Sequence, residues 1–111
     1  VQDVADEARW EAVVAAAVEA FGRLDILVNN AGTVSSRSIG EVDMAAWSRV
    51  IGINLTGTML GCRAAIAAMQ GNPGGAKGSI VNIASTTAIA PLPTDVGYSA
   101  SKAGVRALSK S

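Results

Sequence analysis

Two short apolar runs, Asp25–Asn29 and Ser79–Ser85, alternate along the chain with three stretches that have a helical pattern. Short apolar runs bounded by turn-forming residues are typical of strands that are buried on both faces of a parallel sheet. The order helix, strand, helix, strand, helix is the alternation from which parallel sheets are built. The sequence therefore predicts an α/β fold, and it contains no repeat or low-complexity segment.

The boundaries of the expected helices follow from capping and breaking residues. An aspartate suits a helix N-cap, and a glycine just after the apolar pattern is placed to end a helix. A run rich in Gly, Asn and Pro, Gly71–Gly75, is a clear break between the second helix and the second strand. The three helices are expected to begin at Asp6, near Asp43 and near Val96, and the first is expected to end at Gly22.

Composition limits both the architecture and the partners. A chain of 111 residues permits one small domain at most, and its 50% hydrophobic content argues against disorder. Nine basic and nine acidic residues balance, so there is no electrostatic reason to expect nucleic acid or an anionic membrane surface as a partner. No stretch is expected to have the uninterrupted apolar length of a membrane span.

The absence of histidine and the single cysteine, Cys62, exclude several kinds of chemistry. A zinc site lacks its usual ligands, so no metal is expected. A Ser-His-Asp triad, a Cys-His pair and a histidine proton shuttle are impossible within this chain. Any acid–base step must therefore use Tyr, Lys, Asp or Glu. Cys62 has no partner for a disulfide within the chain, which fits a reducing compartment such as the cytoplasm.

The best candidate for acid–base chemistry is the pair Tyr98 and Lys102 in the sequence Tyr-Ser-Ala-Ser-Lys. Residues four apart on a helix share one face, so the phenol and the ammonium are expected to lie one turn apart. A nearby cation favours the phenolate and lowers the pKa of a tyrosine. Such a tyrosine can exchange a proton with an alcohol or carbonyl oxygen, although the spacing also occurs on ordinary solvated helix faces.

Three further features coincide with this pair. Ser85 and the run Asn29-Asn30-Ala31-Gly32 end the two expected strands, and ligands of open parallel sheets bind at the carboxyl ends of strands. Both are also compatible with ordinary turn chemistry. Asn54 lies among apolar residues of the second expected helix, where a buried amide needs hydrogen-bond partners, and it is equally consistent with a side chain that caps a local kink.

Taken in order, Asn29-Asn30-Ala31-Gly32, Ile53-Asn54-Leu55, Ser85 and Tyr98-x-x-x-Lys102 resemble the classical short-chain dehydrogenase/reductase family. The resemblance covers essentially every residue. It implies the central part of a Rossmann-type, doubly wound parallel sheet. It also implies reversible hydride transfer between NAD or NADP and a secondary alcohol or ketone, and a full-length protein that forms a homo-oligomer, a dimer or a tetramer.

The resemblance also implies a role for each motif residue. Tyr98 would be the catalytic acid/base, and Lys102 would lower its pKa and bind the nicotinamide ribose. Ser85 would orient and polarise the substrate oxygen, while Asn54 would hold a water that extends the proton relay. On the adenosine side, the expected cofactor contacts are Asp3, Val4, Asn30, Ala31 and Gly32.

Parts of the family pattern are missing from this chain. The Gly-rich turn after the first strand is absent, as are the second strand, which selects NAD against NADP, and the substrate region after the active-site helix. Val1 to Asp3 would be the stub of a third strand. Residues 1–111 are therefore expected to form an incomplete NAD(P)-binding domain that is inactive alone, with cofactor preference undetermined.

Two other functions use the same residues. One is epimerisation or dehydration, as in the extended branch of the family, although the sequence around Asn30 and Ser85 resembles the classical branch more. The other is a non-catalytic nucleotide sensor or scaffold that keeps the fold. The residues expected to flank the substrate indicate a small or medium, fairly apolar alcohol or carbonyl; they are Thr33, Val34, Thr86, Thr87, Ala88, Pro91, Leu92 and Pro93.

Overall fold

The two predicted strands lie side by side and run parallel in the computed structural model, which describes residues 2–111. β1 (Ile26–Asn29) and β2 (Ser79–Asn82) pair along their whole length, with Ile26 opposite Ser79. Ile83 N donates to Asn29 O at 3.1 Å, which extends the pairing beyond β2. This confirms the α/β fold, although β2 ends at Asn82 rather than at Ser85.

The helices lie close to their predicted positions. Aspartates cap the three expected helices: the side chains of Asp6, Asp43 and Asp95 each accept a hydrogen bond from a backbone N–H. Gly22 ends the first helix with φ 81°, a left-handed conformation that glycine adopts easily. The helices are α1 (Glu7–Phe21), α2 (Met44–Ile51), α3 (Gly57–Gln70) and α4 (Val96–Leu108), and the short 3₁₀ turns are η2 (Pro73–Gly75) and η3 (Thr86–Ala88).

A π-helical turn, η1 (Gly52–Thr56), joins α2 and α3 into one continuous helix. The sequence predicts this long helix but not the π turn around Asn54. Thr58 Oγ1, at the start of α3, donates to Asn54 O of the turn at 2.8 Å, so this backbone carbonyl accepts from a side-chain hydroxyl. Single π turns inside α-helices are frequent at functional sites.

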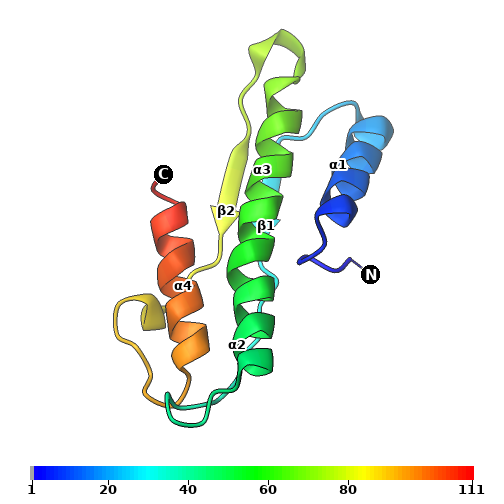
Figure 1. Cartoon of the computed structure of the whole chain (residues 1–111). Helices are drawn as coiled ribbons and strands as arrows, with labels where there is room; N and C mark the ends of the chain where they lie inside the picture. The colour runs from blue at the N-terminus through cyan, green and yellow to red at the C-terminus, as the bar shows by residue number, and fades with distance from the viewer. Residues whose placement is uncertain (1) are drawn as a thin grey trace.

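This continuous helix, Met44–Gln70, has 27 residues and is long and apolar enough to cross a membrane, judged by length and composition alone. The expectation that no stretch reaches such a length is therefore wrong. The core helix of a soluble protein passes the same test. Here the helix packs against α1, α4 and both strands, which is the position of a central core helix (Figure 1).

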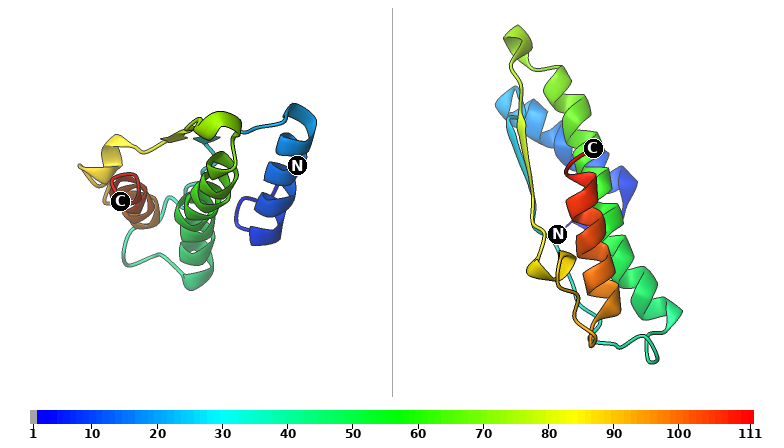
Figure 2. Two further views of the ribbon diagram at one scale, coloured as in Figure 1. Left: turned by 90° about the horizontal axis from the view of Figure 1, so that it is seen from above. Right: turned by 90° about the vertical axis from the view of Figure 1, so that its left-hand side faces the viewer.

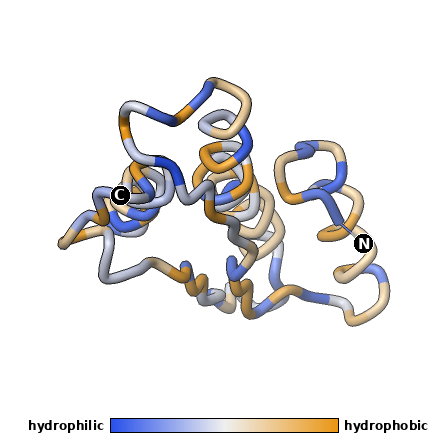
Figure 3. The backbone as a smooth tube through the Cα atoms, turned by 90° about the horizontal axis from the view of Figure 1, so that it is seen from below, coloured by the Kyte–Doolittle hydropathy of each residue, from blue (hydrophilic) through white to orange (hydrophobic). Residues whose placement is uncertain are grey.

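All the helices lie on one face of the two-stranded sheet (Figure 2). Its other face carries apolar side chains that are 65% exposed at Ile26, 54% at Val28, 46% at Val81 and 42% at Ile83. Seen from below, hydrophobic residues follow both strands while the helices gather on one side (Figure 3). The extents are 52 × 25 × 17 Å, and the radius of gyration is 15.4 Å. A compact domain of this length would have a radius of gyration of roughly 13 Å.

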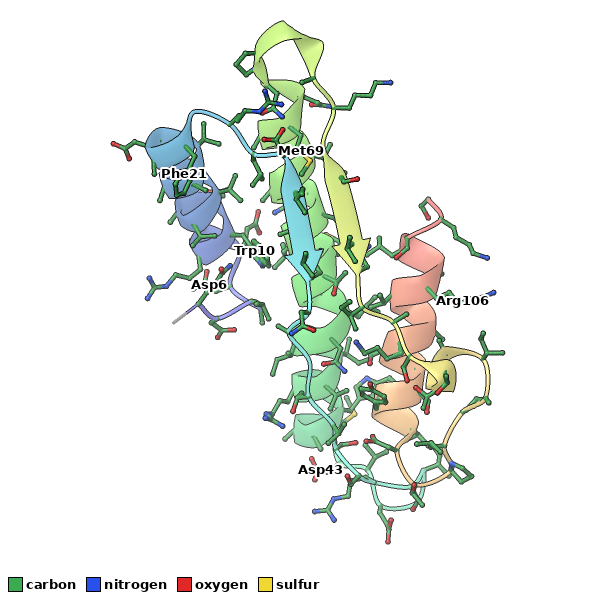
Figure 4. The ribbon with its side chains drawn as sticks, turned by 180° about the vertical axis from the view of Figure 1, so that it is seen from behind. Asp6, Trp10, Phe21, Asp43, Met69 and Arg106 are labelled. Carbon is green, nitrogen blue, oxygen red and sulfur yellow. The ribbon has the colours of Figure 1, made fainter. Side chains whose placement is uncertain are left out.

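The core lies between α1, α3 and β1. Trp10 of α1 packs with Val14 and Leu60, and its indole N–H donates to Val4 O at 2.9 Å (Figure 4). Gly61 of α3 permits this approach, because a Cβ there would lie 2.8 Å from the Trp10 ring. The contact fixes the segment before α1 against the central helix.

Gln2 and Asp3 do not form the strand stub that is expected from Val1 to Asp3. Val1 lies outside the described residues. Asp3 forms a turn instead of a strand, because its carboxylate accepts from Ala5 N at 2.9 Å and its carbonyl accepts from Asp6 N at 3.3 Å. In residues 2–111 the sheet contains β1 and β2, so no strand lies beside this segment to pair with it.

Candidate active site

A cleft of about 480 Å³ opens at the carboxyl ends of β1 and β2, against the first half of α4. Segments that are far apart in sequence meet there. The loop after β1 forms one wall and α4 forms the other. The lining residues are Asn30, Gly32, Thr33, Val34, Ile83, Tyr98 and Lys102.

Tyr98 and Lys102 lie one turn apart on α4, as their spacing predicts. The Lys102 ammonium lies 5.7 Å from the centre of the Tyr98 ring. Lys102 is only 4% exposed, and its Nζ donates to Ile83 O at 2.6 Å. Burial lowers the pKa of Lys102 below its ordinary value of 10.5, because the charged form loses hydration. The half-buried Tyr98 is thus paired with a held cation inside the cleft.

Asn54 is fully buried and connects the loop after β1 to α4. Its Oδ1 accepts from Thr33 N at 2.8 Å, and its Nδ2 donates to Thr33 O at 2.9 Å and to Ser101 Oγ at 3.0 Å. Both amide hydrogens and one acceptor site are therefore used within the protein. A side chain in this position fixes the wall of the cleft, and its own carbonyl group lies in the π turn.

Ser85 lies three residues beyond β2, at the start of η3, which packs against α4. Its Oγ accepts from Thr87 N at 3.2 Å and from Thr87 Oγ1 at 3.0 Å. Ser85 is not among the described residues that line the cleft. The structure therefore brings together Tyr98, Lys102 and the loop residue Thr33, which the Asn54 side chain binds. Ser85 lies on the neighbouring segment.

A second hollow of about 180 Å³ lies on the other side of the loop after β1. Val4 and Trp10 line it, together with Asn30 and Ala31. Gly57 permits this arrangement, because a Cβ there would lie 2.9 Å from Val4 O. Asp3 is exposed and its carboxylate is used in the turn, so it does not line this hollow.

The two hollows share Asn30, and the run Asn30–Gly32 separates them. A ligand with two linked halves, such as a dinucleotide, fits this geometry: one half beside Val4 and the other beside Tyr98 and Lys102. Gly32, at the end of this run, lines the cleft with Tyr98 and Lys102 and has no side chain. A Cβ there would lie 3.6 Å from Asn54 Oδ1 and 3.8 Å from Lys102 Nζ. The residues present therefore fit such a cofactor. Within residues 2–111, no group of three metal-ligating side chains comes together.

The profile of the family described as short chain dehydrogenase matches residues 1–111. The chain belongs to this short-chain dehydrogenase family. A solved structure of a putative short-chain alcohol dehydrogenase from Sinorhizobium meliloti has the same fold, with a TM-score of 0.89 and 41% identity over 97% of this chain and 42% of that one.

Two curated relatives cover nearly the whole chain. A trans-4-hydroxycyclohexanecarboxylate dehydrogenase from Sinomonas cyclohexanicum is 45% identical over 108 residues, which are 97% of this chain and 40% of the relative. A 3-alpha-(or 20-beta)-hydroxysteroid dehydrogenase from Mycobacterium bovis is 42% identical over 98% of this chain and 41% of the relative. The chain thus spans about two fifths of the length of these short-chain dehydrogenases.

The sequence analysis missed one buried residue beside this candidate site: Asp95, which is 6% exposed and caps the helix that carries Tyr98 and Lys102. Burial raises the pKa of its carboxyl, but hydrogen bonds from the Ser35 side chain and from nearby backbone N–H groups outweigh this effect. The pKa of Asp95 therefore lies below its ordinary value of 3.8. An aspartate just before the expected start of a helix signals an N-cap, but only the fold reveals its contacts with the loop after β1.

Proposed function

We propose that this chain is the central part of an NAD(P)-dependent oxidoreductase that interconverts a secondary alcohol and a ketone. The observation that carries the proposal is the Tyr98–Lys102 pair in a cleft that shares Asn30 with a second hollow. Membership of the short-chain dehydrogenase family and the names of the relatives support it.

In this proposal the bound nicotinamide supplies the hydride acceptor or donor. Tyr98 takes the hydroxyl proton when the alcohol is oxidised and returns it when the ketone is reduced, so each hydride transfer is matched by one proton transfer. The Lys102 ammonium stabilises the phenolate and is held by Ile83 O. Ser85 orients the substrate oxygen, and Asn54 holds a water that extends the proton relay from Lys102. The side-chain bonds of Asn54 to Thr33 also position the loop that carries the cofactor contacts.

The proposed cofactor contacts on the adenosine side are Val4, Asn30, Ala31 and Gly32, with Asp3 at the edge. The second hollow, which Val4, Asn30 and Ala31 line, supports this assignment. Neither NAD nor NADP is favoured by the described residues. The choice is made at the end of the second strand of the family's full sheet, and neither β1 nor β2 is that strand.

The proposed substrate is an alicyclic secondary alcohol or the corresponding ketone. Val34 and Ile83 are apolar residues that line the cleft together with Tyr98. Two relatives are named for hydroxyl groups on a cyclohexane ring and on a steroid, which are both alicyclic. The most direct test is to measure NAD(P)H formation with cyclohexanols and hydroxysteroids, using acyclic alcohols of similar size as the comparison.

We also propose that residues 1–111 belong to a longer NAD(P)-binding domain, which is cytoplasmic and oligomeric. The bare apolar face of the sheet and the coverage of about two fifths of each relative support the longer domain. The coding sequence upstream should then encode a strand followed by a Gly-rich turn. Residues 1–111 alone should not oxidise NADH, and turnover by this piece would contradict the proposal.

Replacing Tyr98 with Phe in the full-length protein tests the reaction itself. Loss of a general acid or base lowers the rate by roughly 10²–10⁴-fold, while the affinity for NAD(P)H should change little. Arg106→Ala is the control, because Arg106 is exposed near the end of α4 (Figure 4). A sensor would keep its ligand response in Tyr98→Phe, and an epimerase or dehydratase would convert substrate with no net change in NAD(P)H.

A further inference from the structure

The carboxylate of Asp95 makes contacts on two separate segments. Its Oδ1 accepts from Tyr98 N at 3.3 Å, which is the ordinary contact of an N-cap at the start of α4. The same oxygen accepts from Ser35 Oγ at 2.7 Å, and Oδ2 accepts from Ser35 N at 3.3 Å. Asp95 therefore joins the start of α4 to the loop after β1, 60 residues earlier in the chain.

The loop is bound to α4 by one further hydrogen bond, made by the residue after Ser36. Ser36 has φ 53°, a left-handed conformation that is uncommon for a residue other than glycine and needs support from its surroundings. The next residue, Arg37, accepts from Val96 N at 3.2 Å through its carbonyl oxygen. The loop thus donates hydrogen bonds to the helix start, through Ser35, and accepts one from it, through Arg37.

Both connected segments lead directly into the candidate active site. Thr33 and Val34 line the cleft and immediately precede Ser35. Tyr98, on the opposite wall, follows Asp95 by three residues. A shift of the loop relative to α4 would therefore change the width of the cleft at the phenol of Tyr98.

The other two aspartate caps of the chain do not have this second function. Asp6 accepts from Arg9 N at 3.3 Å, and Asp43 accepts from Ala46 N at 2.8 Å. Both are exposed, and their side-chain contacts stay within three residues. Capping alone requires neither the burial of Asp95 nor its long-range partner.

We propose that Asp95 is a positioning residue for the reaction, in which its carboxylate holds the loop that carries Thr33 and Val34 at a fixed distance from Tyr98. This inference rests on the proposed function. Thr33 is also held by Asn54, so the cofactor contacts just before it, Asn30–Gly32, should depend less on Asp95. The alignment of the substrate should depend on Asp95 more than cofactor binding does.

The test uses Asp95→Ser in the full-length protein. Serine is a good N-cap and can still accept from Tyr98 N, but its side chain has one oxygen and is too short to reach Ser35 as well. Misplacement by about 1 Å in an active site can lower rates about 100-fold, so kcat should fall about 10- to 100-fold. The dissociation constant of NAD(P)H should stay unchanged. Asp43→Ser is the matched control and should leave kcat and KM unchanged.

A double substitution separates positioning from a purely structural effect. Ser35→Ala removes the hydroxyl that donates to Asp95 Oδ1 but keeps the backbone N–H that donates to Oδ2. In this background, adding Asp95→Ser should lower kcat by less than it does in the wild-type background. Wild-type kcat in Asp95→Ser, or independent effects of the two substitutions, would overturn the proposal. If Asp95→Ser does not fold, Asp95→Asn takes its place. Its Nδ2 cannot accept from Ser35 N, so a smaller but measurable loss of kcat is expected, and wild-type kcat would again overturn the proposal.

Hydrogen exchange gives a readout that does not depend on turnover. In the wild-type protein the amide of Ser35 should be protected, and in Asp95→Ser it should exchange faster while the later amides of α4 stay protected. An unprotected Ser35 amide in the wild-type protein would contradict the connection itself. A protected Ser35 amide in a protein that transfers no hydride would instead contradict only the proposed function, on which the role in catalysis depends.

Discussion

The side-chain amide of Asn54 pairs in both directions with the backbone of Thr33, through an N–H···O bond of 2.8 Å and one of 2.9 Å. A second asparagine repeats this arrangement: Asn72 Oδ1 accepts from Leu24 N at 3.3 Å and Asn72 Nδ2 donates to Leu24 O at 2.8 Å. Leu24 precedes β1 and Thr33 follows it. Two asparagines, one within the long helix and one just after it, therefore fix the two ends of the same strand.

The two asparagines provide a matched pair of variants. Each Asn→Ala substitution leaves a partly buried backbone N–H and C=O without their partners, so each should lower the free energy of unfolding of the full-length protein by about 1–3 kcal/mol. Only Asn54→Ala should also lower kcat, because Thr33 lines the cleft whereas Leu24 lies at the far end of β1. Urea unfolding and steady-state kinetics of both variants measure this, and equal kcat values in the two would contradict it.

Local patterns in the sequence were sufficient for most of the fold. Capping aspartates, breaking glycines and apolar periodicity depend on neighbouring residues, and they predicted α1, the long helix, α4 and both strands. The end of β2 was placed too late, because Ile83, Ala84 and Ser85 continue the apolar and small character of the strand. Pairing ends there because β1 itself ends at Asn29.

The site was predicted as a set of residues but not as a set of contacts. The helical spacing of Tyr98 and Lys102 is local, and the structure confirms that they lie together. The contacts of Asn54 with Thr33, and of Asp95 with Ser35, join segments that are far apart in the chain. Such partners depend on how the loop after β1 lies against the long helix and the start of α4, which no local sequence pattern specifies.

Lys102→Met should change both activity and the pH dependence of stability. Without the ammonium the phenolate of Tyr98 loses its stabilising charge, so kcat should fall roughly 10²-fold or more. Because burial lowers the pKa of Lys102, the unfolded chain binds more protons than the folded one as the pH approaches 10.5. The contribution of Lys102 to stability therefore rises with pH from its folded pKa up to 10.5.

Urea unfolding of the wild-type protein and of Lys102→Met at several alkaline pH values measures this effect. In Lys102→Met, the free energy of unfolding should lack the part that rises with pH in the wild-type protein. Lys77→Met is the control, because Lys77 is exposed and lies in the loop before β2. Identical pH profiles for wild type and Lys102→Met would show that Lys102 is not desolvated in the folded protein.

Asp95 should stabilise the protein in the opposite part of the pH range. Its folded pKa is lowered, so the stabilisation is complete above the ordinary value of 3.8 and is lost as the pH falls through the folded pKa. Asp95→Asn lacks this group, so the stability difference between wild type and variant should shrink below that value. Urea unfolding from about pH 6 down to about pH 3 measures it. A difference that stays constant over this range would contradict the lowered pKa.

Gly57 and Gly52 form a last matched pair, because both lie in the long helix and only one faces another segment. A Cβ at Gly57 would lie 2.9 Å from Val4 O, whereas a Cβ at Gly52 meets nothing within 4 Å. Gly57→Ala should therefore cost about 1–3 kcal/mol of stability, as overpacking does. It should also raise the dissociation constant of NAD(P)H, because Val4 must move within the second hollow.

Gly52→Ala should instead stabilise the protein by about 0.5–1 kcal/mol, since alanine loses less backbone entropy in a helix than glycine does. Its dissociation constant for NAD(P)H should equal that of the wild type. Thermal unfolding and fluorescence titration with NAD(P)H measure both quantities. A Gly57→Ala protein that is destabilised but binds NAD(P)H as tightly as the wild type would remove Val4 from the cofactor site, while leaving Tyr98 and Lys102 unaffected. The adenosine half would then have to be sought away from Trp10 and the start of the chain.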